Sequence, residues 1–215
     1  WERLALLKAW PVAGSMAVGR AFLNMAKPFI FGVGKMDCDG ALAIVQNVRA
    51  VKEMIDAKMA ERGHERRTVK LGIGGIREHE FLAQTVQVLA GKQVPALLDR
   101  STLGALPRFV TRRLISGRER DELTAAYLFL RDVEHKLQMV HDLQTHALPD
   151  ETEELERCAI RGGYDGSDRT AAVKKFLADH AAHTAAVHRA FQSLFYEPVT
   201  SPVFKATLRA MGAKG

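Results

Sequence analysis

The sequence has few cysteines, and they lie far apart. Cys38 and Cys158 are the only two in 215 residues, so neither a disulfide framework nor a paired-cysteine metal site is available. We therefore expect a reducing compartment, the cytoplasm, rather than secretion.

Long apolar runs are also absent. Lys8, Arg20, Lys27 and Lys35 interrupt the hydrophobic N-terminal region before it reaches the roughly 18 to 20 residues that span a bilayer. The sequence thus predicts no membrane segment. Because residue 1 is Trp rather than Met and an apolar helical pattern starts at once, we expect the chain to be part of a longer polypeptide.

The residues that are present suffice for a packed core. Hydrophobic residues make up 47% of the chain and charged residues 26%, and 31 Lys plus Arg against 25 Asp plus Glu give a net charge of +6. This charge favours anionic partners, and a nucleotide, RNA or an acidic protein surface all fit it.

Hydrophobic periodicity predicts a mainly α fold, a helical bundle. Apolar residues at three and four spacing, with proline and glycine as breaks, indicate helices over 4–8, 16–25, 41–59, 76–90, 102–115, 118–145, 151–161 and 167–195. One short strand is expected at 68–72, where Val69 and Leu71 alternate with Lys70, so the N-terminal lobe is expected to be α+β. The tail at 198–215 is expected to be weakly ordered.

The most informative segment joins this strand to the next helix through three glycines. A cation stands on each side of the glycines and two carboxylates follow, which gives the nucleotide or phosphate candidates Lys70, Gly72, Gly74, Gly75, Arg77, Glu78 and Glu80. Backbone amides at such a turn bind anions, while the cations hold phosphate and a carboxylate orients a metal or a hydroxyl. The same spacing is also typical of a tight turn with acidic residues in the first helical turn.

A polar line accompanies the apolar stripe of the helix predicted at 118–145. Its members recur at three and four spacing: Arg131, Glu134, Gln138, Asp142 and Thr145. They face either a functional cleft or bulk water, where the first two form a weak surface pair.

Other candidate ligands are disfavoured. Asp37 and Asp39 lie two apart, as magnesium-binding carboxylates do, but their glycine-rich flanks favour a turn that caps the next helix. The eight histidines form no set with metal-ligand spacing and a carboxylate partner. We therefore predict neither a metal ligand nor a catalytic residue.

Several segments, taken in order, resemble one family, glutamate-ammonia-ligase adenylyltransferase, which adds AMP to glutamine synthetase and removes it. The segments are Trp1–Ala9, Pro11–Gly14, Pro28-Phe29, Lys70–Gly72 with Gly74–Glu78 and Glu80-Phe81, Tyr127–Arg131 with Glu134-His135 and Leu137-Gln138, and Gln144–His146 with Leu148-Pro149.

The resemblance implies which part of that enzyme the chain represents. Arg77-Glu78 together with Gln144–His146 resembles the N-terminal half, which is associated with phosphorolytic deadenylylation. Residues 1–100 would then end a nucleotidyltransferase-like domain and residues 101–197 would form a helical bundle domain, with the metal-binding aspartates upstream. The chain departs from the family pattern at four places. Trp10 stands where Arg is usual, Ser15 where Asp is usual and His79 where Ile is usual. Phe31–Lys35 replaces an aromatic segment with paired arginines.

By resemblance, the intact enzyme uses magnesium and ATP or phosphate, acts on glutamine synthetase and responds to the PII signal protein. Lys70, Arg77, Glu78 and Glu80 would lie near its nucleotide cleft, and the line from Arg131 to Thr145 would form a functional surface of the helical domain. We predict that the isolated chain is inactive.

The alternative is a non-catalytic helical scaffold that binds a regulator such as PII. Nonspecific nucleic-acid binding through Arg62–Arg67 is disfavoured, because no aromatic stacking platform accompanies that patch.

Overall fold

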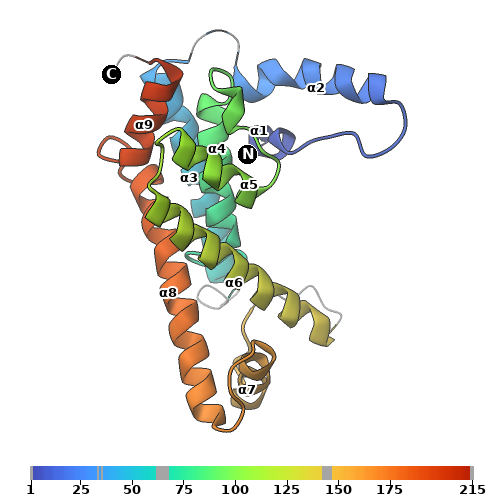
Figure 1. The fold of residues 1–215 in the computed structure, drawn as a ribbon, viewed down its shortest axis with the longest axis vertical. Coiled ribbons are helices and arrows are strands. Elements are labelled where there is room, and N and C mark those ends of the chain that lie inside the picture. The colour runs from blue at the N-terminus through green and yellow to red at the C-terminus, as the bar shows by residue number, and fades with distance from the viewer. Residues whose placement is uncertain (1, 33, 35, 62–67, 142–146, 214–215) are drawn as a thin grey trace. The chain divides into compact units, whose positions relative to one another are not determined.

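The computed structural model describes residues 2–32, 34, 36–61, 68–141 and 147–213, except the side chains of residues 140 and 141, and it is helical over most of this length (Figure 1). The helices are α1 Glu2–Leu7, α2 Met16–Phe31, α3 Cys38–Glu61, α4 Ile76–Ala90, η1 Pro95–Leu97, α5 Thr102–Thr111, α6 Gly117–His141, α7 Thr152–Arg161, α8 Arg169–Phe195 and α9 Pro202–Met211. The predicted mainly α, helical-bundle class is confirmed.

The chain divides into two compact units. The first comprises residues 1–51, 80–120 and 192–215, and the second comprises residues 52–79 and 121–191. Each unit draws residues from both predicted domains, and the division into domains 1–100 and 101–197 stays a prediction.

The core of the first unit is built from α3, α4, α5 and the C-terminal helices. Side chains that are nearly inaccessible to solvent include Val45, Leu89, Leu106, Phe109 and Leu194. The periodic apolar positions predicted for residues 41–51 and for α4 therefore face this core.

Helix α6 supplies the core of the second unit. Its apolar stripe of Leu123, Ala126, Leu130, Val133 and Leu137 is at most 4% exposed. The predicted stripe is thus confirmed over these five positions.

The strand expected at residues 68–72 is wrong. Thr68 forms an isolated antiparallel bridge with Ala147, and the residues after it form turns closed by hydrogen bonds from Gly72 N–H to Thr68 O and from Ile76 N–H to Val69 O. Alternation alone does not make a strand, because its backbone groups need a neighbouring strand as partner. Within the described residues none runs beside this segment.

The end of one helix also differs from expectation. Helix α2 continues through Pro28 to Phe31, where we expected it to end before the proline. Ile30 in this last turn is buried, and burying its side chain offsets the hydrogen bond that proline removes.

The tail expected to be weakly ordered instead contains a packed helix. Helix α9 starts with Ser201 as N-cap, whose hydroxyl accepts a hydrogen bond from Phe204 N–H, and it ends at Gly212 in the left-handed conformation. Val203, Phe204 and Met211 are buried in the first unit.

Candidate functional site

The glycine turn before α4 satisfies its own backbone. The amides of Gly75, Ile76 and Arg77 donate to the carbonyls of Gly72, Val69 and Lys70 at 2.9–3.1 Å. These three N–H groups are therefore engaged inside the turn and do not point to an anion, and the anion site expected at this turn stays a prediction.

Gly74 lets α8 approach the turn closely. Its φ is +68°, and a Cβ built on it would lie 2.0 Å from the carbonyl oxygen of Thr184 in α8. Only glycine fits this position, because both the backbone conformation and the space exclude a side chain. The turn is thus fixed against α8 within the second unit.

Glu78 lies in a buried ion pair. Lys52 and Glu78 are each 1% exposed, and Lys52 Nζ lies 3.1 Å from Glu78 Oε1. The same ammonium group donates to Asp56 Oδ1 at 2.5 Å and to Leu71 O at 3.1 Å, which occupies its three donors. His188 Nδ1 lies 3.1 Å from the other oxygen of Glu78. Both oxygens of this carboxylate are therefore engaged by protein groups.

A second buried carboxylate, Glu134 on α6, joins the two candidate sets predicted from the sequence. Lys70 Nζ from the turn lies 3.4 Å from Glu134 Oε1, and Arg131 on α6 donates to Glu134 Oε2 at 2.5 Å. Glu134 is 1% exposed as a residue, so this part of the polar line is not a solvated face. The Lys70–Glu134–Arg131 cluster is a feature of the second unit.

The remaining candidates lie in different surroundings. Glu80 faces Lys8 at 3.9 Å in the first unit, and Gln138 is partly exposed on α6. Asp142 and Thr145 lie outside the described residues, as does the basic segment Arg62–Arg67.

The departures from the family pattern have local structural roles. Arg100 stacks over the Trp10 ring at 3.9 Å, and the Ser15 hydroxyl caps α2. His79 is fully buried, where its Nε2 donates to Leu123 O at 2.9 Å and its ring lies 5.0 Å from that of Tyr127. A polar side chain is thereby accommodated in the core of the second unit.

Metal-binding geometry is not found among the described residues, where no three His, Cys, Asp or Glu side chains are grouped to hold an ion. Asp37 Oδ1 accepts a hydrogen bond from Gly40 N–H at 2.8 Å, which caps the start of α3 as the turn interpretation predicted.

An aromatic cluster lies elsewhere in the second unit. The rings of His183 and Phe129 are 4.6 Å apart, and His180 packs between Phe129 and Phe176 at 6.4 and 6.5 Å. Burial lowers the pKa of His180, with a smaller contribution from nearby His183, and burial also lowers the pKa of His183. Both side chains therefore favour the neutral form.

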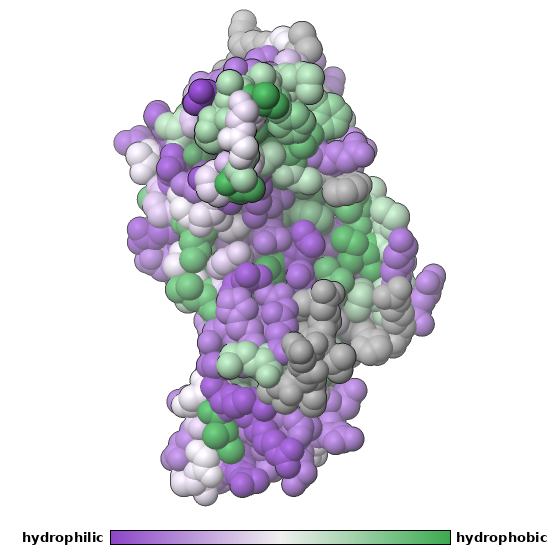
Figure 2. All heavy atoms as spheres, turned by 90° about the vertical axis from the view of Figure 1, so that its right-hand side faces the viewer, coloured by the Kyte–Doolittle hydropathy of each residue, from purple (hydrophilic) through white to green (hydrophobic). Residues whose placement is uncertain are grey.

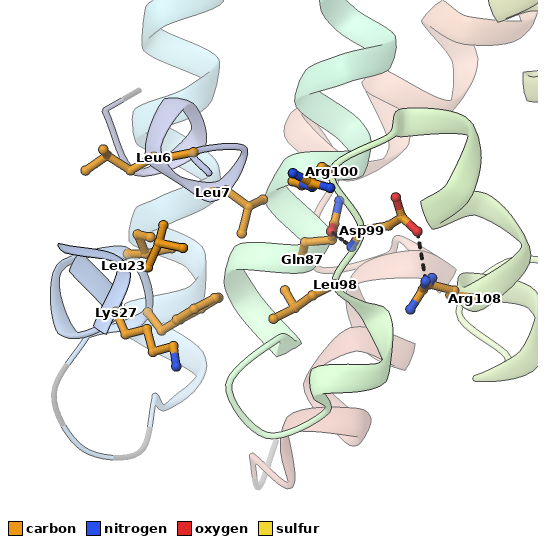
Figure 3. A pocket seen from close by; sticks show the side chains of 12 residues that line it. Leu6, Leu7, Leu23, Lys27, Gln87, Leu98, Asp99, Arg100 and Arg108 are labelled. Atoms are coloured by element: carbon orange, nitrogen blue, oxygen red, sulfur yellow. Dashed lines mark hydrogen bonds and ion pairs between the residues drawn. The ribbon is translucent and has the colours of Figure 1, made fainter. Parts of the chain in front are cut away.

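The first unit contains a cavity of about 410 Å³ with an apolar wall that includes Leu6, Leu7, Leu23 and Leu98 (Figure 3). At its polar side, Arg108 contacts Asp99 at 2.8 Å. None of the residues predicted as site candidates lines this cavity.

Exposed apolar side chains of the first unit gather on α2 and the loop before it. They are Trp10, Val12, Met16, Val18, Phe22, Met25 and Phe29. Figure 2, which views the side where α2 lies in Figure 1, shows hydrophobic surface toward its upper end. Among the described helices, none combines the length and the apolar character that crossing a bilayer requires.

Sequence reasoning missed Lys52, His188 and Thr184. Lys52 reads as one of the polar positions of an amphipathic helix, and His188 as a helical surface histidine. Their pairing with Glu78 spans 26 and 110 residues, a distance over which a single sequence carries no signal of contact. The adjacent glycines Gly74 and Gly75 are the one feature of the sequence that indicates a close approach by another element.

Comparison with known proteins decides the family. The family model described as GlnD PII-uridylyltransferase matches residues 49–195, which is more than half of the chain. The chain belongs to this family. The match covers the glycine turn, Lys52, Glu134 and His188, so the two buried charge clusters lie within the region that defines the GlnD PII-uridylyltransferase family.

Within the curated proteins, the similar relatives are bifunctional glutamine synthetase adenylyltransferase/adenylyl-removing enzymes. The one from Agrobacterium fabrum is 45% identical over 77% of this chain and 16% of its own length, and the one from Mesorhizobium japonicum is 39% identical over 99% of this chain and 22% of its own length. The resemblance predicted from the sequence motifs is confirmed. The chain spans about a fifth of the length of such relatives.

Proposed function

We propose that this chain is a portion of an enzyme that attaches AMP to glutamine synthetase and removes it. The similarity to bifunctional enzymes over 99% of the chain carries the proposal. The two buried carboxylates beside the glycine turn support it, because they hold cationic side chains at a segment predicted to border the nucleotide cleft.

In this proposal the chain contributes cations to the cleft rather than metal ligands. Lys70 and Arg77 suit the phosphate groups of ATP or free phosphate. Glu78 and Glu134 are engaged by cations and Glu80 faces Lys8, so these carboxylates do not fit a magnesium site. Magnesium would neutralise charge on the transferred phosphoryl group, and its ligands are expected upstream of the segment that corresponds to Trp1.

The roles that we propose for the residues combine these contacts with the resemblance to the adenylyltransferase family. Lys70 and Arg77 border the nucleotide, while Glu78 is held by Lys52 and thereby fixes the first turn of α4. The glycines at 72, 74 and 75 shape the turn. Arg131, Glu134 and Gln138, with Asp142 and Thr145, form the adjoining surface of the helical part.

The proposed partners are glutamine synthetase as protein substrate, PII as regulator and the other domains of the same polypeptide, in the cytoplasm. The isolated chain is expected to be inactive, since in-line transfer requires metal-bound carboxylates in addition to a phosphate site.

A chimera tests this function. This chain replaces the matching segment of the Mesorhizobium japonicum relative, and transfer of AMP to glutamine synthetase and its removal are both measured. The segment of the Agrobacterium fabrum relative, placed in the same host, is the matched control.

We expect the chimera that carries this chain to perform at least one of the two reactions at a rate comparable to that of the control chimera. A folded chimera that performs neither reaction, beside an active control chimera, contradicts the proposed function.

A further inference from the structure

Two cations from different elements share one buried carboxylate in the second unit. Lys70 stands in the turn before α4 and Arg131 stands on α6, and each contacts a different oxygen of Glu134. The Glu134 side chain is 2% exposed, whereas those of Lys70 and Arg131 are 31% and 37% exposed. The carboxylate is therefore enclosed, and its two cations extend toward solvent.

The cations retain hydrogen-bonding capacity. Among the residues that the structure describes, Glu134 is the ion-pair partner of both Lys70 and Arg131, and it accepts a hydrogen bond from one of the five donors of Arg131 but none from Lys70. One carboxylate charge against two cations leaves one positive charge within this group of three. Such a group attracts an anion that can accept several hydrogen bonds at once.

We propose that Lys70 and Arg131, held in place by Glu134, form a binding site for a phosphate group. The proposal deepens the proposed function, on which it rests, by assigning Arg131 to the phosphate rather than to a separate helical surface. A planar guanidinium and a flexible ammonium group suit the tetrahedral oxygens of phosphate, while Glu134 limits the rotamers of both side chains.

A pair with the same spacing elsewhere in the second unit provides the contrast. Arg157 on α7 donates to Glu154 Oε1 at 2.5 Å, also at i and i+3, but it shares its charge with a second carboxylate, Glu153, at 3.4 Å. That group has one negative charge in excess and both Arg157 and Glu153 are more than half exposed. It has the spacing of the Arg131 pair, with the order of arginine and glutamate reversed, and lacks the features that attract phosphate.

Titration of the 215-residue chain with inorganic phosphate, ATP and adenosine, followed by NMR, tests the site. Amide shifts near Lys70 and Arg131 report weak binding directly. The variants are Arg131→Gln, Arg131→Lys and Lys70→Met, with Arg157→Gln as the matched control, and thermal melting verifies that each is folded.

We expect phosphate and ATP to shift these amides and adenosine to leave them unchanged. Arg131→Gln and Lys70→Met should each weaken binding by about tenfold or more, as expected for loss of a hydrogen bond to a charged group, while Arg157→Gln has no effect and Arg131→Lys restores part of the affinity. Tighter binding of ATP than of phosphate identifies the nucleotide as the source of the phosphate group, and equal binding identifies free phosphate.

Absence of shifts with both phosphate and ATP, or equal affinities of the wild type and both folded variants, overturns the inference. The proposed function fails separately. An inactive chimera contradicts the proposed function even if the 215-residue chain binds phosphate. An active chimera supports the proposed function even if the titration detects no binding of phosphate at any concentration.

Discussion

At the scale of single residues, Lys52 lies in an environment that is unusual for a lysine, because its side chain is buried. An ammonium group that is 1% exposed carries a desolvation cost of several kcal/mol, on the order of that for other buried ions. Asp56, Glu78 and the Leu71 carbonyl offset this cost by accepting from all three donors. Glu78 depends on Lys52 in the same way, because it too is buried.

Lys52→Met should lower the free energy of unfolding by about 3–5 kcal/mol, since it leaves Glu78 buried without its cation. Urea denaturation measures the change. Lys136→Met removes an i,i+4 pair with the exposed Asp132 and should cost less than about 1 kcal/mol. Equal losses in the two variants would show that Glu78 does not depend on Lys52.

The histidines that pack on Phe129 make stability depend on pH. Their pKa values are lowered in the folded chain, so the unfolded chain binds protons first as the pH falls below the ordinary value of 6.5. The free energy of unfolding should therefore fall with pH below 6.5, by at most about 1.4 kcal/mol per pH unit for each proton.

His180→Phe should reduce this dependence, because it removes one of the two groups and keeps a ring between Phe129 and Phe176. The check is urea denaturation at several pH values, with exposed His135→Phe as control for loss of a histidine away from the cluster. An unchanged slope in His180→Phe together with a reduced slope in His135→Phe would refute the assignment.

At the scale of elements, the contact of α8 with the glycine turn is the closest approach involving a candidate site residue. Gly74→Ala should cost about 3 kcal/mol or more, because a left-handed alanine is strained and its Cβ meets Thr184 O. Gly163 has a φ of +88° but open space around it, so Gly163→Ala should cost only about 1 kcal/mol. Thermal or urea unfolding of both variants separates strain from steric overlap, and equal costs would rule out the overlap.

The positions of the helices are predicted well from the sequence where the hydrophobic pattern extends over many residues. Helix α4 begins at Ile76 and ends at Ala90 as predicted, because a turn precedes it and Gly91 follows it. Helix α9 was missed although Ser201 before Pro202 and Gly212 after Met211 are ordinary start and stop signals. The expected strand failed because alternation over five residues does not reveal whether a partner strand exists.

At the scale of the whole molecule, the series of motifs along the chain predicted the family. The chemistry of individual residues predicted only part of the candidate site. Lys70, Arg131 and Glu134 were each identified, but in two separate sets, because their proximity depends on how the turn packs on α6. The sequence around Lys52 and His188 does not indicate that either residue contacts Glu78. Burial and pairing across the chain are properties of the fold rather than of a motif.

The most direct test of this account is the KM for phosphate, or for ATP, in the reaction that the chimera catalyses, with Arg131→Gln compared against Arg157→Gln. We predict a KM that rises about tenfold or more in Arg131→Gln and stays at the parent value in Arg157→Gln. An unchanged KM in an active Arg131→Gln chimera would contradict the claim that the charge cluster beside the glycine turn serves the nucleotide chemistry of this enzyme.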